Sequence, residues 1–250
     1  MINITPEQLY HLLCKYQAEL KLSNIYMGFQ PDSITAFDKF PEYQELWQKF
    51  IKHDDDNNIG DAARLWSLIL NCRQIIEEGI PGHYAELGVW KGNTAAVLAY
   101  YAKISDKKAY FFDTYSGFEK RDFVGLDAGV EVAFQDTSID LVMETVGTEN
   151  IHCEYIKGYF PDSLQKHHQD NVFSVVSIDC DLYEPIKAGL DFFYPRMSQG
   201  GILYLHDYSS GYWDGAKKAI DEFCKATGEH LVLMPDKSGS AFLRKSKKNA

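Results

Sequence analysis

The last two thirds of the sequence alternate between short apolar runs and amphipathic stretches long enough to form a helix. This alternation predicts β-α-β units, whose right-handed crossovers make successive strands parallel. Only residues 235–240 separate the last two apolar runs, too few for a helical crossover, so these runs predict an antiparallel hairpin. The expected fold class is therefore α/β, with a mostly parallel seven-stranded sheet that ends in an antiparallel hairpin. The predicted strands are 84–89, 109–113, 152–156, 173–179, 201–206, 231–234 and 241–244, and the predicted helices are 93–104, 137–146, 161–168, 185–197 and 214–227.

The sequence before these units is helical and irregular. Apolar residues at helical spacing predict helices over 6–22 and 61–78, the second with Asp61 as its N-cap. The connection between them, 28–60, is rich in aromatic residues, and we expect it to pack against another part of the molecule.

The composition argues against several classes of protein. The chain has 25 Lys and Arg against 36 Asp and Glu, a net charge of −11, which disfavours nucleic-acid binding. Its five cysteines include no Cys-x-x-Cys pair, which predicts reduced thiols. We see neither a signal-peptide pattern nor an apolar run of about 18 residues, so we expect a soluble, cytoplasmic protein without a membrane span. The acidic run 54–56 lacks the glycine and glutamate spacing of an EF-hand, so a solvated loop is expected.

Residues that follow the first two predicted strands could bind a ligand. Gly88 allows a tight turn beside a ligand, and Gly92 lets the start of the next helix approach it. Trp90 fills the turn where a dinucleotide fingerprint needs its middle glycine, which disfavours NAD. Asp113 lies 25 residues beyond Gly88 and could accept hydrogen bonds from ribose hydroxyls. Simple helix–strand packing for the glycines and a capping role for Asp113 remain alternatives.

Acidic residues follow the fourth and fifth predicted strands. Asp179 and Asp181 are two residues apart, so in extended backbone they face the same side, and His206 and Asp207 end the neighbouring strand. Hard oxygen ligands from two strand ends suit Mg²⁺, Mn²⁺ or Ca²⁺. The alternative is structural, with Asp181 capping the following helix and Asp207 capping a turn.

Taken together, these motifs resemble the macrocin O-methyltransferase family of sugar O-methyltransferases over roughly residues 80–245. The resemblance implies a Rossmann-like class I methyltransferase fold. It also implies an enzyme that uses S-adenosylmethionine and a divalent metal, usually Mg²⁺, to methylate a hydroxyl of a sugar-containing small molecule. Family members commonly associate, so we expect a homo-oligomer. The segments that carry the resemblance are 86–92, 112–118, 157–164, 177–185 and 200–208.

The resemblance also implies two sets of site residues. In the first set, Asp113 would take the ribose hydroxyls, and Asp162 and Ser163 would flank the adenine. In the second set, Asp181 would be the general base. The cofactor-binding set is Glu86, Gly88, Gly92, Thr94, Asp113, Asp162, Ser163 and Asp179. The reaction set is Asp181 and His206 as catalytic residues, with Asp179, His206 and Asp207 as metal ligands.

One residue departs from the family pattern. His206 stands where the best-known members carry a second acid. It could coordinate the metal, which would suit Mn²⁺ better than Mg²⁺, or turn away and leave a water, or act as a base.

The resemblance leaves other functions open. These are methylation of a catechol or another phenol, binding of S-adenosylmethionine without catalysis and, more remotely, NAD-dependent dehydrogenation. Residues 1–80 would form a helical lid that selects the acceptor, or a dimer contact, and residues 81–250 the methyltransferase domain.

Overall fold

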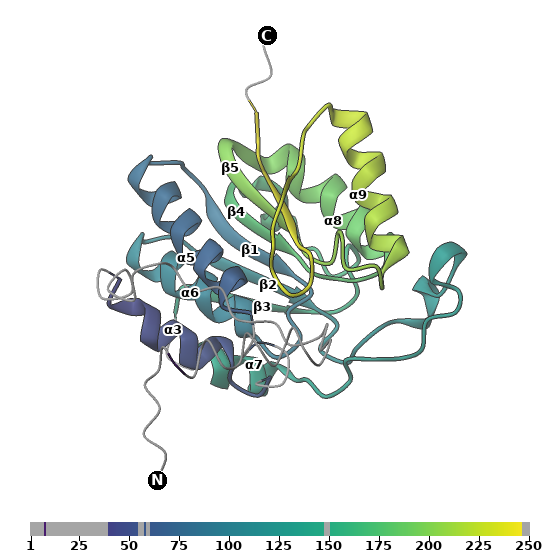
Figure 1. Ribbon diagram of the computed structural model, residues 1–250, viewed down its shortest axis with the longest axis horizontal. Helices are drawn as coiled ribbons and strands as arrows, with labels where there is room; N and C mark the ends of the chain where they lie inside the picture. Colours follow the sequence, from purple (N-terminus) through teal and green to yellow (C-terminus); the bar gives the residue numbers. More distant parts are fainter. Residues whose placement is uncertain (1–7, 9–39, 55–57, 59–60, 148–150, 247–250) are drawn as a thin grey trace.

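The computed structural model describes residues 8, 40–54, 58, 61–147 and 151–246. Within these residues, seven strands form one sheet in the order β3-β2-β1-β4-β5-β7-β6 (Figure 1). The first five strands in this order pair in parallel, and β7 is antiparallel to both β5 and β6, so the predicted sheet and its hairpin are confirmed. The strands are β1 (His83–Leu87), β2 (Ala109–Asp113), β3 (Cys153–Lys157), β4 (Phe173–Ile178), β5 (Met197–Leu205), β6 (Val232–Leu233) and β7 (Ala241–Arg244).

Helices cover both faces of this sheet. Figure 1 shows α3, α5 and α6 on one side and α8 and α9 on the other. No helix in the described part of the chain is both long and apolar enough to cross a membrane. The helices are α3 (Glu42–Phe50), α5 (Ala62–Glu77), α6 (Asn93–Ile104), α7 (Ile139–Val146), α8 (Tyr183–Arg196) and α9 (Asp214–Thr227), with 3₁₀ turns η1 (Lys120–Asp122), η2 (Gly125–Asp127) and η3 (Lys166–Asp170).

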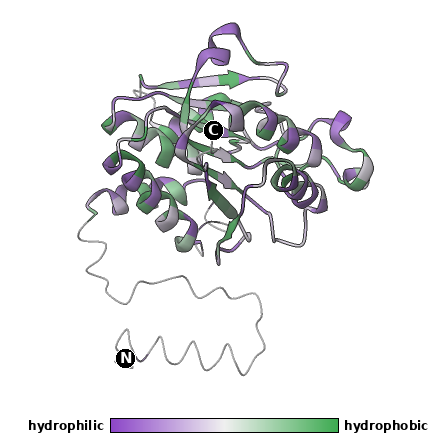
Figure 2. Ribbon diagram, turned by 90° about the horizontal axis from the view of Figure 1, so that it is seen from above, coloured by the Kyte–Doolittle hydropathy of each residue, from purple (hydrophilic) through white to green (hydrophobic). Residues whose placement is uncertain are grey.

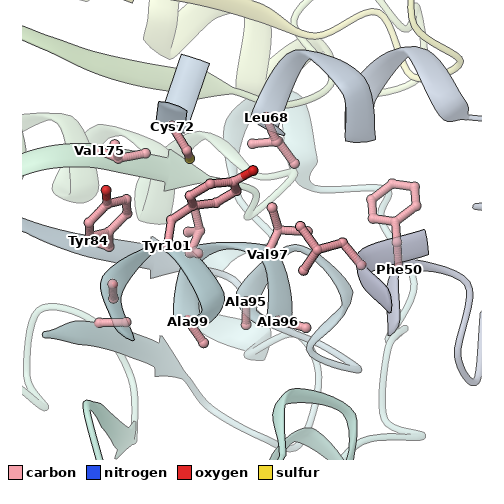
Figure 3. Packing of buried hydrophobic residues seen from close by; sticks show 14 of the residues in the cluster. Phe50, Leu68, Cys72, Tyr84, Ala95, Ala96, Val97, Ala99, Tyr101 and Val175 are labelled. Carbon is pink, nitrogen blue, oxygen red and sulfur yellow. The ribbon is translucent and has the colours of Figure 1, made fainter. Parts of the chain in front are cut away.

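Alternation along the strands divides the hydrophobic core into two clusters. Tyr84 and Val175 belong to the cluster under α3, α5, α6 and α7, where Figure 3 shows them beside Tyr101. The next residues along the same strands, Ala85 and Val176, belong to the cluster under α8 and α9. Figure 2 shows hydrophobic colouring along the central strands and mixed colouring on the outer helices. Both faces of the sheet are therefore buried, as expected for parallel strands.

The N-terminal helices are packed onto the sheet domain. The predicted helix over 61–78 is confirmed as α5, and the Asp61 side chain caps it by accepting from the N–H of Arg64. Helix α3 was not predicted, although Tyr43, Leu46 and Phe50 have helical spacing and are buried. The predicted helix over 6–22 lies outside the described residues.

The predicted helix over 161–168 is wrong. The segment forms turns and then η3, because local side chains bind its backbone instead. Nδ1 of the buried His168 accepts from the N–H of Gln165 at 2.9 Å, and its Nε2 donates to Glu154 on β3 at 2.9 Å.

Candidate functional site

A cleft of about 290 Å³ lies at the carboxyl ends of the parallel strands. Loops from β1, β2, β4 and β5 meet there, which is the ligand-binding position of open α/β sheets. Of the predicted site residues, the cleft is lined by Glu86, Gly88, Thr94, Asp113, Asp179, Asp181, His206 and Asp207. Gly92, Asp162 and Ser163 do not line it.

The two glycines after β1 have packing roles of their own. A Cβ atom on Gly88, whose φ is +85°, would lie 1.9 Å from the carbonyl oxygen of Asp179, so only glycine lets the ends of β1 and β4 meet here. Gly92, with φ of 84°, precedes α6, and a Cβ there would lie 3.0 Å from Val142 of α7. The packing alternative therefore holds for both glycines, and Gly88 also lines the cleft.

Glu86 places on the cleft wall a carboxyl oxygen that has no hydrogen-bond partner among the described residues. The residue is 1% exposed, and its Oε2 has no hydrogen-bond partner. Burial, together with the negative charge of Asp179, raises the pKa of Glu86 well above its ordinary value. A ligand that brings a donor or a positive charge to this carboxyl group would relieve that cost.

The Asp113 carboxylate accepts hydrogen bonds from the loops that follow β1 and β2. Its Oδ2 accepts from the N–H groups of Val89 and Trp90 at 2.6 and 3.0 Å, and its Oδ1 accepts from the N–H of Tyr115 at 2.6 Å. Much of the acceptor capacity of this carboxylate is thus used within the protein. Its predicted contact with ribose hydroxyls stays a prediction.

The residues predicted to flank the adenine lie outside the cleft. The Asp162 carboxylate pairs with Arg121 at 2.8 Å, and both side chains are more than half exposed. The Oγ of Ser163 is buried without a hydrogen-bond partner. Tyr159 and Phe160, which precede this segment in the sequence, do line the cleft.

Asp179, His206 and Asp207 converge at the ends of β4 and β5. Nδ1 of His206 is 2.8 Å from Oδ1 of Asp179 and 2.7 Å from Oδ2 of Asp207. One potential ligand atom from each residue lies within 4.8 Å of the others, a spacing that a metal ion could bridge. Burial would raise the pKa of Asp207, but His206 and the hydrogen bond from Asp181 outweigh it and hold that pKa below its ordinary value.

Asp181 does not cap α8, because Asp127 accepts the hydrogen bond at the start of that helix. The N–H of Tyr183 donates to Oδ2 of Asp127 at 2.8 Å, and Asp127 is buried beneath α9 on η2. Asp181 itself has a positive φ of 61° and hydrogen bonds to Asp207. Burial and the charges of Asp179 and Asp207 raise the pKa of Asp181 well above its ordinary value.

Sequence reasoning missed Arg64, which enters the site from α5. Its Nη1 lies 2.6 Å from Nε2 of His206 and 3.9 Å from Asp179, and its Nη2 donates to Asn58 at 2.5 Å. The one signal in the sequence was an arginine beside Leu65 and Trp66 on the apolar side of a predicted helix. The partner of Arg64 lies 142 residues away, beyond the reach of any motif.

An aromatic wall, also missed, closes part of the cleft. We use this name for Trp90, Phe118, Phe134 and Trp213, which all line the cleft. Their ring centroids are 5.0 to 5.8 Å apart from Trp90 through Phe134 and Phe118 to Trp213. Three loops, after β1, β2 and β5, are therefore joined by one set of edge-to-face contacts.

A comparison with protein families shows which family the chain belongs to. The family model described as macrocin-O-methyltransferase (TylF) matches residues 57–244. The chain belongs to the macrocin O-methyltransferase family. The predicted resemblance and the α/β methyltransferase fold are thus confirmed.

Curated relatives are more distant in sequence. The 8-demethyl-8-(2,3-dimethoxy-alpha-L-rhamnosyl)-tetracenomycin-C 4'-O-methyltransferase of Streptomyces olivaceus is 24% identical over 173 residues, covering 64% of each chain. The mycinamicin III 3''-O-methyltransferase of Micromonospora griseorubida is 26% identical over 148 residues, covering 53% of this chain and 58% of that one. The chain therefore spans less than two thirds of the length of these relatives.

Solved structures agree on the fold. The O-methyltransferase NovP superposes with a TM-score of 0.63 at 20% identity, over 74% of this chain and 80% of that one. The calicheamicin methyltransferase CalS11 has a TM-score of 0.61 at 20% identity, over 97% of this chain and 94% of that one.

Proposed function

We propose that this member of the family is an S-adenosylmethionine-dependent O-methyltransferase that methylates a hydroxyl group of a sugar-containing acceptor. One observation carries the proposal: a cofactor-side carboxyl group, Glu86, and the acid cluster at Asp179, Asp181 and Asp207 line the same cleft. The named activities of the two curated relatives, both O-methyltransferases, support it.

The β1–β2 side of the cleft suits S-adenosylmethionine, which carries an ammonium and a sulfonium charge. The buried Oε2 of Glu86 has no protein partner, and a cationic ligand would supply one. Gly88 lines the cleft, so its backbone would border a ligand at the strand end. The aromatic wall beside it offers flat apolar surface for the cofactor or the acceptor.

The β4–β5 side suits a divalent cation through its carboxylates. Asp179 and Asp207 offer the hard oxygen ligands that Mg²⁺ and Mn²⁺ accept, with other positions left to water or substrate. His206, the third proposed ligand, faces them with Nδ1, and it could coordinate only if that nitrogen gave up its hydrogen. When bound, such a cation would acidify the acceptor hydroxyl.

The protein residues would do the remaining work. Once Asp181 has released to solvent the proton that it donates to Asp207, its carboxylate would take the proton from the acceptor hydroxyl as the methyl group passes from the sulfonium to that oxygen and the sulfur leaves as a neutral thioether. In the free protein the protonated Asp181 is hydrogen-bonded to Asp207, which would hold its side chain at the end of β4 before an acceptor arrives. The packed aromatic wall would exclude water from the cofactor side.

Two measurements test the proposal: calorimetric titration with the cofactor, and then an assay of methyl transfer. We expect selective binding of S-adenosylmethionine, with NAD as the control ligand, and then methylation of sugar glycosides or sugar nucleotides that falls in EDTA. Turnover of catechol but of no sugar would replace the sugar by a phenol as the acceptor. Binding without turnover of any acceptor would favour a non-catalytic binding protein, and absence of binding would overturn the proposal.

A further inference from the structure

The lining of the cleft holds many more acidic groups than basic ones. Eight Asp and Glu residues line it, and five of them already have proposed roles toward the cofactor, the metal or the proton. The other three are Asp54, Glu119 and Asp122. Arg64 is the one lysine or arginine among the described residues that line the cleft. The charge of the lining therefore restricts which acceptors can enter.

Arg64 is already engaged within the protein. Its side chain is 10% exposed, and its Nε lies 3.2 Å from Oδ2 of Asp61. Its Nη2 donates to Asn58 at 2.5 Å, and its Nη1 lies 2.6 Å from Nε2 of His206. Asn58 donates to the carbonyl oxygen of Phe50 at 2.7 Å, so a polar chain runs from the end of α3 to the end of β5. A phosphate group would have to share the guanidinium nitrogens with Asn58 and His206.

The negative excess does not depend on how the buried groups titrate. If Glu86 and Asp181 are counted as neutral and His206 as a cation, six carboxylates still face only two cations, His206 and Arg64, among the described lining residues. A divalent cation and the net positive charge of S-adenosylmethionine would not make this lining positive. One oxygen of the buried Glu86 also has no hydrogen-bond partner among the described residues, which shows how few donors the lining offers to an acid.

The three carboxyl groups without a role suit an acceptor that carries hydroxyl groups. Asp54 follows α3, and Glu119 and Asp122 lie in the connection after β2. Asp122 is 4% exposed, and its Oδ1 accepts from the hydroxyl of Tyr159 at 2.5 Å, which holds this carboxyl group in place. Carboxylates only accept hydrogen bonds, and sugar hydroxyls can donate to them, whereas ionised phosphate oxygens cannot. The aromatic wall adds flat apolar surface for the C–H face of a sugar ring.

We infer that the acceptor is a glycoside without phosphate or carboxylate groups, and not a sugar nucleotide. This inference rests on the proposed function and narrows its substrate class. A nucleoside diphosphate would bring further negative charge into a lining of carboxylates whose one guanidinium group is already engaged. Like charges placed together in this way select against the wrong ligand.

The first experiment offers a panel of hexoses and deoxyhexoses in two forms, as neutral methyl glycosides and as nucleoside diphosphate esters. It measures kcat/KM for both forms with S-adenosylmethionine and Mg²⁺ present. We expect the neutral form to be favoured by about tenfold or more, and the difference to narrow as added salt screens the charges. Equal or faster turnover of the nucleotide forms would overturn the inference. Failure of the proposed function would instead appear as a protein that neither binds S-adenosylmethionine nor methylates either form.

The second experiment needs no turnover. UDP and dTDP are titrated by calorimetry into the wild-type protein in Mg²⁺, after saturation with S-adenosylhomocysteine to block the cofactor position. We expect no binding with a dissociation constant below about 1 mM, the range of a weak complex. Micromolar binding of either nucleotide to the saturated protein would contradict the inference.

Glu119→Lys adds a cation to the lining, and Glu131→Lys is its matched control. Both residues lie in the connection between β2 and α7, and both substitutions change the net charge equally, but Glu131 is exposed and does not line the cleft. We expect Glu119→Lys to reduce the preference for the neutral form by about two- to tenfold, and Glu131→Lys to keep the wild-type preference. An unchanged preference in Glu119→Lys, or the same change in both variants, would refute a preference set by the cleft. If Glu119→Lys fails to fold, Glu119→Gln removes one charge and should reduce the preference by a smaller factor.

Discussion

The two sides of the cleft use their carboxyl groups in different ways. On the β1–β2 side, Asp113 binds backbone N–H groups of the adjoining loops, and Glu86 is left without a partner. On the β4–β5 side, Asp179 and Asp207 share a donor in His206, which Arg64 supports from α5. The first side is therefore held by local hydrogen bonds and keeps one buried carboxyl oxygen without a partner among the described residues. The second is a coupled cluster whose geometry depends on an element distant in the sequence.

The largest effect on activity is expected for Asp181→Asn, on the β4–β5 side. Because Asp181 is the proposed base, its replacement should lower kcat by about 10²- to 10⁴-fold, while affinity for S-adenosylmethionine stays near the wild-type value. Single-turnover kinetics and calorimetry measure the two quantities. The control is Asp191→Asn on α8. Asp191 is exposed and pairs with Lys187, so this variant should keep full activity. Wild-type-like turnover by Asp181→Asn would remove Asp181 from the base role.

Gly88→Ala tests the rigidity of the other side. The new Cβ would collide with the Asp179 carbonyl, and the positive φ adds strain, so the free energy of unfolding should fall by more than about 3 kcal/mol. Urea denaturation measures this change. Gly211→Ala is the matched control, with φ of +76° and no atom within 4 Å, and it should cost about 1 kcal/mol. Equal losses of stability in the two variants would show that the close approach of the Asp179 carbonyl does not explain why residue 88 is glycine.

Glu86→Gln gives a smaller, pH-dependent effect on stability. Because the folded-state pKa of Glu86 is raised above 4.5, wild-type folding binds a proton, and stability falls as pH rises from about 4.5 through the folded pKa. The glutamine variant lacks this cost, so its stability relative to wild type should increase with pH and the difference should vanish in acid. Urea denaturation from about pH 4 to about pH 8 checks the trend, because this range begins near the ordinary pKa of a glutamate and extends well above it. A difference independent of pH would contradict it, and weaker binding of S-adenosylmethionine should accompany the substitution.

The smallest effect is expected for Asp162→Ala. The side chain pairs with Arg121 at the surface and does not line the cleft, so stability should change by less than about 1 kcal/mol. We expect the dissociation constant of S-adenosylmethionine to stay within about twofold of wild type, equivalent to less than about 0.5 kcal/mol. A larger loss would support the adenine contact that family resemblance implies, and would extend the cofactor side beyond the observed cleft.

The comparison also explains what the sequence could predict. Alternating apolar residues such as Tyr84 and Ala85 identify buried parallel strands, because each strand carries both faces in its own sequence. Strand-end residues such as Asp179 and Asp207 could be grouped because parallel strands bring their carboxyl ends to one edge. These inferences need only local pattern and topology.

The remaining features depend on contacts that no local pattern records. Arg64 was missed because its role arises from a partner 142 residues away. The helix expected over 161–168 failed because His168 binds a backbone N–H and β3 in place of a helical ladder. Helix α3 was missed because its buried aromatic residues were interpreted as an irregular connection, although their spacing was helical.

The polar chain from Phe50 through Asn58 and Arg64 to His206 has a consequence for engineering. Exchanging N-terminal regions between family members would test the expectation that this region selects the acceptor. In this protein such a chimera would also exchange Arg64, whose Nη1 lies 2.6 Å from Nε2 of His206. A graft that changes the residue at position 64 without a matching change at position 206 would break this contact, so the two positions should be transplanted as a pair.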